Sequence, residues 1–357
     1  MKFSNIFICG NFGYKNERLN GQTVKTRVMK SYINKIIGNQ NVKFVDTSYV
    51  KDRPYHTIKS IKNQFKESSH IVMMPDVRAF SVLLPLYVLW NKGNKKDIRY
   101  VVTGGWLPGF LKKYKIYIHL LKKIDGIYVQ AKQMDEELKE LGLENVKVFP
   151  NYREFNFTPT ENRVVTNELK LVYYSRVLRE KGIEIAIEAV EKINRDSEYN
   201  SVVKLDIYGQ IQSSYEKRFE VIMSERSKDI QYKGVLKPEG AYNILSEYDL
   251  MVFPTFFTSE GFPGAVLDAY ISGVPVLASD WLYNKEFVKE GITGWLFKPQ
   301  NVDDLVYKIS QFLVLDKSEK ENILSKMRKN CVSEASKYHV DKVIPVLLND
   351  MGISSEA

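Results

Sequence analysis

The sequence predicts an α/β protein built from two doubly wound, Rossmann-like domains that face each other across a cleft. Three observations support this fold class. Short apolar runs alternate with helical segments along the chain, as in parallel sheets covered on both faces. The 357 residues exceed what one ordinary hydrophobic core holds. A polar, aperiodic stretch at residues 151–168 separates two such series and is predicted to be a linker.

The first series opens with a short apolar run at residues 6–9, which is too short for anything but a strand. A loop rich in Gly and Asn follows, and the alternation then continues to residue 149. The expected strands are 6–9, 42–46, 70–74, 99–103, 126–129 and 146–149, and the expected helices are 22–37, 56–66, 79–90, 108–123 and 132–141. Residues 1–155 are therefore predicted to form the first domain.

The second series follows the predicted linker and ends in three consecutive helices. The expected strands are 169–174, 202–208, 230–233, 250–253 and 274–278, and the expected helices are 183–193, 214–225, 238–247, 265–271, 303–315, 317–331 and 340–351. We expect the second domain to span residues 165–335, with the last helix, within 340–357, packing back on the first domain. Ligands of such sheets bind beyond the carboxyl ends of the strands, so the loops there are the places to search.

Charge is distributed unevenly between the two halves. Residues 1–168 hold 28 of the 52 Lys and Arg but only 15 of the 43 Asp and Glu, a net of +13, whereas the remainder has a net of −4. This half either faces an anionic partner or has a solvated, lysine-rich surface. The predicted helix 108–123 carries five lysines beside Leu, Ile and Tyr, which is typical of helices on anionic membranes and also of ordinary surface helices.

The cysteines and the absence of several known sequence motifs limit the possible location and function of the protein. Cys9 and Cys331 are far apart and are expected to be free thiols in a reducing compartment. We therefore expect a cytoplasmic protein. A second expectation is peripheral contact with the inner face of the cell membrane. Strands combining aromatic and basic residues are absent, so nucleic acid is not the expected partner. The sequence has no Walker A, H-E-x-x-H, G-x-S-x-G or D-x-D pattern, and no metal site is expected.

Residues 249–280 hold the main candidate site. A buried strand leads to an acid, Glu260, and then to a turn that opens a helix, Gly261, Phe262, Pro263, Gly264 and Ala265. Free N–H groups and the positive end of the helix dipole make this turn an anion site. Glu260 would repel a phosphate, so its better use is to accept hydrogen bonds from sugar hydroxyls. Asp268, about one turn into the helix, can accept from a ribose. The alternatives are that Glu260 caps the helix and that Asp268 lies on the surface.

Two cations follow the first strand of the second domain. Arg176 and Lys181 lie on a strand-to-helix loop that should open at the same sheet edge. Such fixed cations suit a diphosphate, with Arg binding in bidentate fashion and Lys as a point charge. Arg179 is a competing candidate. Gly209, which ends the next strand, is expected to line the same site.

The first domain offers weaker candidates. Gly21 opens a helix after the first loop and could cover a phosphate. Thr103, Gly104, Gly105 and Trp106 end a strand, where two glycines leave room for a substrate and Trp106 could stack on a sugar ring or pack in the core.

The segment SEGFPGAVLDAYISGVPVLAS, residues 259–279, resembles the signature of the family 4 glycosyltransferases, which have the GT-B fold. Their pattern, E-x7-E followed by A-x3-G-x-P-V, is matched by Glu260, Asp268, Ala269, Gly273 and the pair at 275–276. Residues 175–182 resemble the family's G-R-x4-K-G, and Tyr208-Gly209 falls where the family has it. Residues 104–108, GGWLP, are similar to members that build bacterial capsule or exopolysaccharide.

This resemblance implies a nucleoside-diphosphate-sugar donor held by the second domain. It implies that Glu260 contacts the transferred sugar, that Asp268 contacts the ribose, and that Arg176 and Lys181 hold the diphosphate. It further implies transfer with retention of configuration, without a metal, to a hydroxyl of a glycan acceptor, expected to be lipid-linked, that enters from the first domain. Two positions depart from the pattern, because the second acid is Asp and residues 103–105 lack the histidine that many members carry.

A nucleic-acid-binding protein, suggested by the basic first half, is the weakest alternative, and two others remain. One is a nucleotide-sugar epimerase on the same two-domain fold, which would need acids or histidines around the sugar that the sequence does not provide. The other is a non-catalytic partner subunit of a glycosyltransferase, which intact Glu260, Arg176 and Lys181 disfavour.

Overall fold

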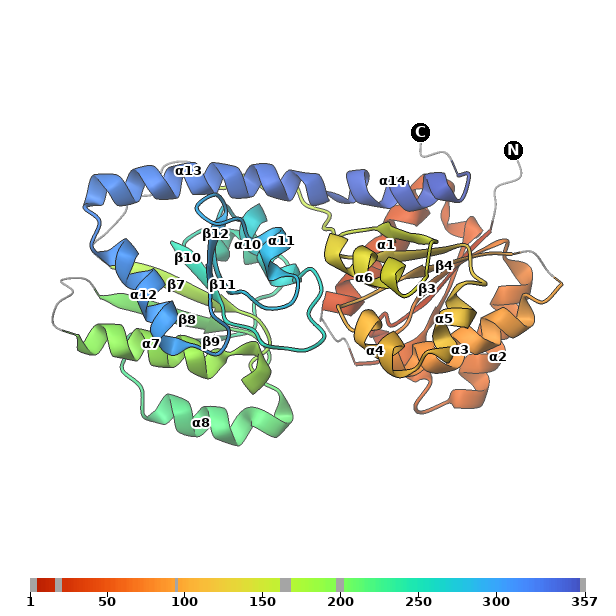
Figure 1. Ribbon diagram of the computed structural model, residues 1–357, viewed down its shortest axis with the longest axis horizontal. Helices are drawn as coiled ribbons and strands as arrows, with labels where there is room; N and C mark the ends of the chain where they lie inside the picture. The colour runs from red at the N-terminus through yellow and green to blue at the C-terminus, as the bar shows by residue number, and fades with distance from the viewer. Residues whose placement is uncertain (1–4, 17–20, 94–95, 161–167, 197–201, 354–357) are drawn as a thin grey trace. The chain divides into compact units, whose positions relative to one another are not determined.

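The computed structural model describes residues 5–16, 21–93, 96–160, 168–196 and 202–353. The chain divides into two compact units (Figure 1). Unit 1 comprises Met1–Glu154 and Tyr338–Ala357, and unit 2 comprises Phe155–Lys337. Each unit contains a six-stranded sheet in which every pairing is parallel, with helices on both faces. The predicted class, α/β with two doubly wound domains, is confirmed.

Unit 1 has the strand order β2-β1-β3-β4-β5-β6. Its strands are β1 (Ile6–Gly10), β2 (Val42–Asp46), β3 (His70–Met74), β4 (Asp97–Val101), β5 (Gly126–Val129) and β6 (Val146–Val148), and its helices are α1 (Gly21–Ile37), α2 (Pro54–Glu67), α3 (Val77–Trp90), α4 (Leu107–Lys113), α5 (Ile116–Leu121), α6 (Lys132–Glu140) and α14 (Val340–Asp350). Every residue of β1 is buried, because helices cover both faces of a parallel sheet.

The helix α14 belongs to unit 1 although it lies near the end of the chain. Its apolar face, including Ile344 and Leu347, packs with Met29 and Ile33 of α1 in one core. At its end, the Tyr128 hydroxyl donates to Asp350 at 2.7 Å, and the Lys147 ammonium binds the other carboxylate oxygen at 2.6 Å. These contacts tie the last helix to the sheet edge formed by β5 and β6.

The prediction of one helix over residues 108–123 is wrong. The chain forms α4 and α5 instead, with a break at Tyr114, whose φ of −121° and ψ of 71° are not helical. The ring centroids of Phe110 and Tyr117 lie 5.0 Å apart. Seven residues of one straight helix span about 10.5 Å, so the helix must break for these two rings to pack together.

Unit 2 has the strand order β12-β11-β10-β7-β8-β9. Its strands are β7 (Leu169–Tyr174), β8 (Val203–Tyr208), β9 (Ile230–Gly234), β10 (Leu250–Phe253), β11 (Val276–Ser279) and β12 (Gly294–Phe297), and its helices are α7 (Ile183–Arg195), α8 (Glu216–Ser224), α9 (Ala241–Leu245), α10 (Gly264–Ile271), α11 (Asn284–Phe287), α12 (Val302–Leu313) and α13 (Lys317–Ala335). The helices α7 and α12 pack together on one side of the sheet, and α10 and α13 lie on the other (Figure 1).

Several sequence-based boundaries differ from the structure, and the strand expected over 99–103 is β4, which begins and ends two residues earlier. The strand β12 was not predicted, the helix expected over residues 238–247 is the short α9, and the strand expected over 274–278 begins two residues later as β11. The linker predicted at 151–168 begins too early, because Asn151, Tyr152 and Arg153 are buried in unit 1. Its residues 161–167 lie outside the described residues, as does Asn20 beside the candidate Gly21.

The strand order of unit 2 marks where a ligand would bind. From β7 the chain proceeds outward through β8 and β9, and from β10 it proceeds the other way through β11 and β12. The order therefore reverses between β7 and β10, and open parallel sheets bind ligands beyond the carboxyl ends of the strands at such a point. Among the helices of the described residues, none is both long and apolar enough to cross a bilayer.

Candidate functional site

The loops that follow β7 and β10 meet at this switch point. The first contains Arg176 and ends in a short 3-10 turn, Arg179–Lys181, before α7 begins. The second runs from Pro254 through Glu260 to α10. The backbone N–H of Phe256 donates to the carbonyl of Glu180 at 2.8 Å, which ties the two loops together.

A buried ion pair joins the two loops. The ammonium of Lys181 binds Oε2 of Glu260, and the Thr255 hydroxyl donates to the same oxygen at 3.0 Å. Lys181 is 7% exposed and Glu260 8% exposed. The other carboxylate oxygen, Oε1, has no hydrogen-bond partner among the described residues. Glu260 is thus held by one oxygen only. It does not cap α10, whose N-cap residue is Pro263.

Two glycines allow the backbone to pack closely around this site. Gly182 has a φ of +75°, and a β-carbon there would lie 2.0 Å from the carbonyl oxygen of Pro254. At Gly209, with a φ of +150°, a β-carbon would lie 1.8 Å from the carbonyl oxygen of Ser175. A side chain at Gly182 would push the loops after β7 and β10 apart, and one at Gly209 would push the end of β8 away from the loop after β7. Gly209 therefore has a packing role at the site, besides any contact with a ligand.

Both candidate cations lie near one aromatic ring. The Arg176 guanidinium carbon is 5.5 Å from the centroid of Phe257, and the Lys181 ammonium is 5.0 Å from it. Arg176 is exposed and forms no ion pair with any residue in the described part of the chain. One cation is therefore buried and paired, and the other is solvent-exposed and available to an anion.

The amino end of α10 is open toward this region. Pro263 is the N-cap residue and supplies no side-chain acceptor, so the first N–H groups of the helix, at Gly264 and Ala265, are left for a ligand or water. Just before the helix, the ring of Phe262 stacks on Phe287 with centroids 3.9 Å apart, which fixes the turn after Gly261. Glu260, Gly261, Phe262 and Pro263 are all buried.

Asp268 lies in the middle of α10 and is buried, at 8% exposed. The alternative that it is a surface residue is therefore wrong. It has interactions of its own, so burial alone does not assign it to a ribose.

The first-domain candidates lie in unit 1. Gly21 is the first residue of α1. Trp106 is half-buried and donates from its indole N–H to the carbonyl of Thr103 at 3.0 Å. Its ring packs edge-on against Phe80 and Phe110, with centroids 5.3 and 5.5 Å apart, after the turn formed by Gly104 and Gly105. These contacts agree with the interpretation of Trp106 as a core residue and leave stacking on a sugar as a hypothesis.

Sequence analysis did not predict two residues of the site. Thr255 and Phe257 lie between the predicted strand 250–253 and Glu260. Thr255 is fully buried and reaches Glu260, and Phe257 lies near both cations. The available signal was their place directly after a buried strand at the edge where ligands bind.

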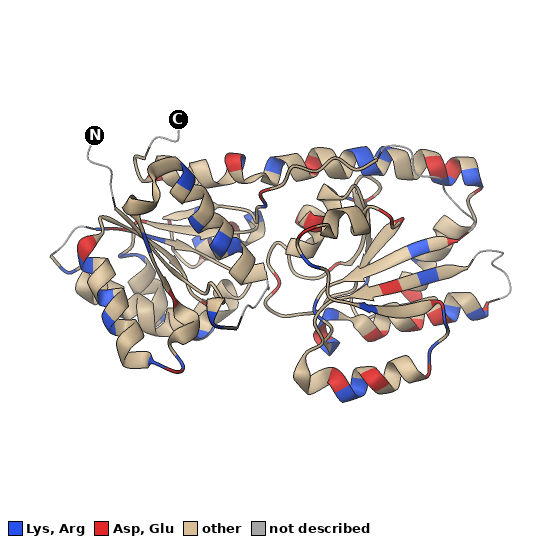
Figure 2. Cartoon of the chain, turned by 180° about the vertical axis from the view of Figure 1, so that it is seen from behind, with Lys and Arg blue, Asp and Glu red and all other residues tan. Residues whose placement is uncertain are grey.

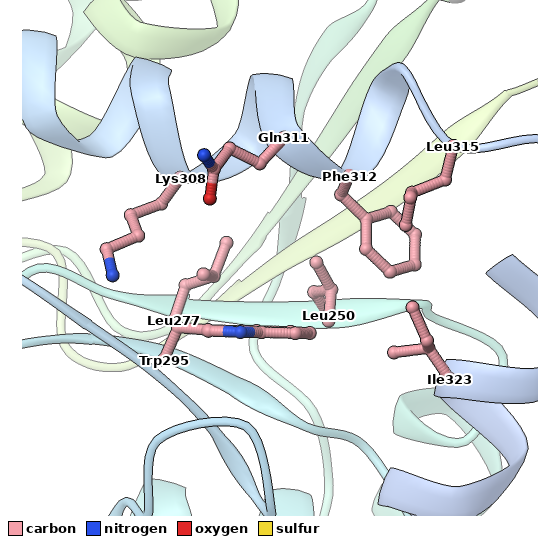
Figure 3. Close-up of a pocket in the computed structure, with 8 residues that line it drawn as sticks. All are labelled: Leu250, Leu277, Trp295, Lys308, Gln311, Phe312, Leu315 and Ile323. Carbon is pink, nitrogen blue, oxygen red and sulfur yellow. The ribbon is translucent and has the colours of Figure 1, made fainter. Parts of the chain in front are cut away.

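A separate pocket in unit 2 does not coincide with this site. It lies between α12, α13 and the sheet, and Figure 3 shows its apolar lining with Lys308 and Gln311 at one side. Its lining residues are Leu250, Leu277, Trp295, Lys308, Gln311, Phe312, Leu315 and Ile323. Leu250 is the first residue of β10, whereas the Lys181–Glu260 pair follows the opposite end of that strand. This pocket is a gap in the packing of α12, away from the loops at the switch point.

The fold and the site define a class of protein. Many nucleotide-binding proteins share these features, a doubly wound unit with cations and an open helix terminus at its switch point. Residues 153–337, slightly more than half of the chain, match the family model of glycosyl transferases group 1. The chain belongs to this family. The finer assignment to family 4 with its E-x7-E pattern stays a prediction.

Similar proteins agree with this assignment. The capsular polysaccharide biosynthesis glycosyltransferase CapH of Staphylococcus aureus is 23% identical over 172 residues, 47% of each chain. A lipopolysaccharide 1,2-N-acetylglucosaminetransferase of Salmonella typhimurium is 28% identical over 174 residues, 46% of this chain and 44% of that protein. The chain thus spans about half the length of the curated relatives it matches. HepE of Anabaena, solved with UDP-glucose, superposes with a TM-score of 0.74 over 98% of this chain and 99% of its own, at 14% identity, and supports the GT-B fold.

Proposed function

We propose that this chain is a glycosyltransferase that moves a sugar from a nucleoside-diphosphate sugar to a hydroxyl of a glycan acceptor. The observation that carries the proposal is the buried Lys181–Glu260 pair at the switch point of unit 2, with one carboxylate oxygen left open. Family membership and the names of the relatives support this activity over epimerisation and over a non-catalytic role.

In this proposal, the diphosphate of the donor lies between the cations and the helix. Arg176 would bind it in bidentate fashion, and the first N–H groups of α10 at Gly264 and Ala265 would donate to it. Lys181 has three donors, and its bond to Glu260 uses one of them. It can therefore bind a phosphate oxygen while it keeps Glu260 in place.

Glu260 would bind the hydroxyl groups of the transferred sugar. Its open oxygen, Oε1, can accept hydrogen bonds from two hydroxyls, because a carboxylate oxygen has two lone-pair directions. Paired with a cation, the carboxylate can lie beside a diphosphate with less repulsion than a lone acid would suffer. Asp268 would accept from the ribose of the donor.

The reaction would proceed with retention and without a metal. The bond between the anomeric carbon and the phosphate oxygen breaks, the acceptor hydroxyl attacks from the same face, and its proton passes to the leaving phosphate oxygen. Unit 2 contains no histidine, and this route needs none. Arg176, Lys181 and the α10 terminus would stabilise the charge that develops on the leaving group.

The acceptor would be a growing polysaccharide, carried on a lipid at the inner face of the bacterial cell membrane. The support is the naming of the relatives, which act in capsule or lipopolysaccharide synthesis. Thr103 to Trp106 in unit 1 are the acceptor-side candidates.

A screen of nucleotide-sugars for thermal stabilisation tests the proposal. A true donor at about 100 times its dissociation constant stabilises the fold by roughly 2.7 kcal/mol. Turnover of that donor in the presence of a chelator tests metal independence. The anomeric configuration of the product, read by NMR, tests retention. A chain that responds to no nucleotide-sugar would refute the proposal, and an inverted product would refute the mechanism alone.

A further inference from the structure

We propose that Tyr173 is a positioning residue for sugar transfer, whose hydroxyl holds Arg176 and Lys181 in the places that a diphosphate would contact. Tyr173 lies near the end of β7, and both cations lie in the loop that follows, residues 175–182, which we call the β7 loop. The inference rests on the proposed function, in which these two cations bind the diphosphate of the donor.

The hydroxyl of Tyr173 reaches the backbone of both cation residues. It donates to the carbonyl of Arg176 at 2.9 Å and, over a longer distance of 3.4 Å, to the carbonyl of Lys181. A phenol has a single hydrogen to donate, so the two carbonyls share it. One side chain thus joins the two ends of the segment 176–181, which carries both cations.

Other hydrogen bonds hold the middle of this segment. The Val177 N–H donates to the carbonyl of Gln210 at 2.9 Å, and the Glu180 carbonyl accepts from the Phe256 N–H at 2.8 Å. These bonds fix the path of the β7 loop between the cations. The Tyr173 hydroxyl acts at the two cation residues themselves, so its loss should displace them more than the rest of the loop.

The surroundings of Tyr173 keep its hydroxyl in place and able to donate. Its ring is fully buried in the core that β7 shares with α7 and α12. Burial also raises the pKa of the Tyr173 phenol well above its ordinary value of 10, so the group stays protonated at neutral pH. The packed core therefore fixes the hydroxyl, and the hydroxyl fixes the cations.

The placement of these cations matters because charge on the helices of unit 2 is mixed. Figure 2 shows acidic and basic residues together along α8 and α13. Attraction of an anion to the switch point should therefore depend on the individual cations there. A displacement of about 1 Å at a site can lower a rate about 10²-fold, so even a small shift of the β7 loop should be measurable.

The variant Tyr173→Phe tests the inference, because it keeps the ring and removes only the hydroxyl. Titration calorimetry with UDP, GDP, ADP and dTDP identifies the nucleoside diphosphate that the wild type binds most tightly. We expect Tyr173→Phe to bind it about tenfold more weakly, and kcat/KM for the matching nucleotide-sugar to fall about tenfold or more. A tyrosine with a purely structural role would lower the melting temperature and leave both constants unchanged.

The matched control is Tyr270→Phe. Tyr270 is also fully buried in unit 2, and its hydroxyl donates to the carbonyl of Phe287 in α11 at 2.9 Å rather than to the β7 loop. The control should lower the melting temperature by a similar amount, because it also removes one buried hydrogen bond. It should keep the affinity for the nucleotide within about twofold of the wild type.

A double-mutant cycle separates positioning of the cations from a general loosening of unit 2. If Tyr173 acts through both cations, Tyr173→Phe should weaken binding less in the Arg176→Ala background than in the wild type. Equal affinities of Tyr173→Phe and Tyr270→Phe, or independent effects of Tyr173 and Arg176, would overturn the inference alone. A wild type that binds none of the four nucleotides would instead refute the proposed function on which it rests.

Discussion

The two units share a six-stranded parallel sheet, yet each contains a buried lysine with a very different environment. In unit 2, Lys181 is paired with Oε2 of Glu260, whose other carboxylate oxygen forms no hydrogen bond with the described residues. In unit 1, Lys25 of α1 is 1% exposed, and its ammonium has no hydrogen-bond partner in the described part of the chain. It lies 5.6 and 5.4 Å from the rings of Phe149 and Tyr152.

The two lysines therefore differ in how their burial is compensated. Burial, with a smaller contribution from the charge of Arg153, lowers the pKa of Lys25 to about 7. No polar group hydrogen-bonded to its ammonium compensates for the free energy of hydration that is lost on burial. The Lys181 pair instead brings opposite charges together at the edge where ligands bind, and truncating either partner leaves a buried charge.

The strongest test of this comparison breaks the pair in unit 2. Lys181→Met should abolish turnover and lower the free energy of unfolding by about 3–5 kcal/mol, because Glu260 is left as an uncompensated buried charge. Urea unfolding and donor turnover measure the two effects. The double variant Lys181→Met with Glu260→Leu should regain most of the stability and none of the activity. Equal stability of the single and double variants would show that the pair is not coupled.

Arg176, the exposed cation, should affect catalytic activity but not the stability of the fold. Arg176→Ala should lower kcat about 10²–10³-fold, the usual effect of removing one fixed donor to a developing negative charge. Its stability should hardly change, since Arg176 is exposed. Arg179→Ala is the matched control on the same loop, and it should lower kcat less than about threefold. The pKa of Glu184 is lowered mainly by hydrogen bonds from Arg218 and Tyr215 and by the charge of Arg218. The charge of Arg179 makes a smaller contribution to the same shift. The reverse result would transfer the role to Arg179.

The buried Lys25 of unit 1 should make the stability of the fold depend on pH. Lys25 has a folded-state pKa of about 7, below its ordinary value of 10.5, so the unfolded chain binds more protons between these values. Stability should therefore rise with pH through this window. Lys25→Met should raise the free energy of unfolding by about 2 kcal/mol at pH 7 and by less at pH 9. Unfolding of both proteins at the two pH values measures the difference, and a gain that did not shrink with pH would contradict this account.

The architecture could be predicted from the sequence because the strands are short apolar runs that end clearly at glycine, proline or polar residues. The sequence also placed Lys181 and Glu260 on two loops at one sheet edge, which follows from parallel topology alone. Their direct pairing could not be predicted, because the loops meet only once Gly182 lets the backbone approach Pro254. The break at Tyr114 was hidden for a similar reason, since it depends on Phe110 and Tyr117 sharing contacts with Phe80.

The smallest expected effect concerns how Glu260 is oriented. Thr255→Val keeps the shape of the side chain but removes the hydroxyl that donates to Oε2 at 3.0 Å. We expect about a tenfold loss in kcat/KM for the nucleotide-sugar, in line with one hydrogen bond to a charged group, and recovery in Thr255→Ser. Affinity for the free nucleoside diphosphate, measured by calorimetry, should be unchanged, because Glu260 would contact only the sugar. An equal loss for both ligands would mean that Thr255 supports the loop as a whole, and the comparison with Lys25 would then rest on Lys181 alone.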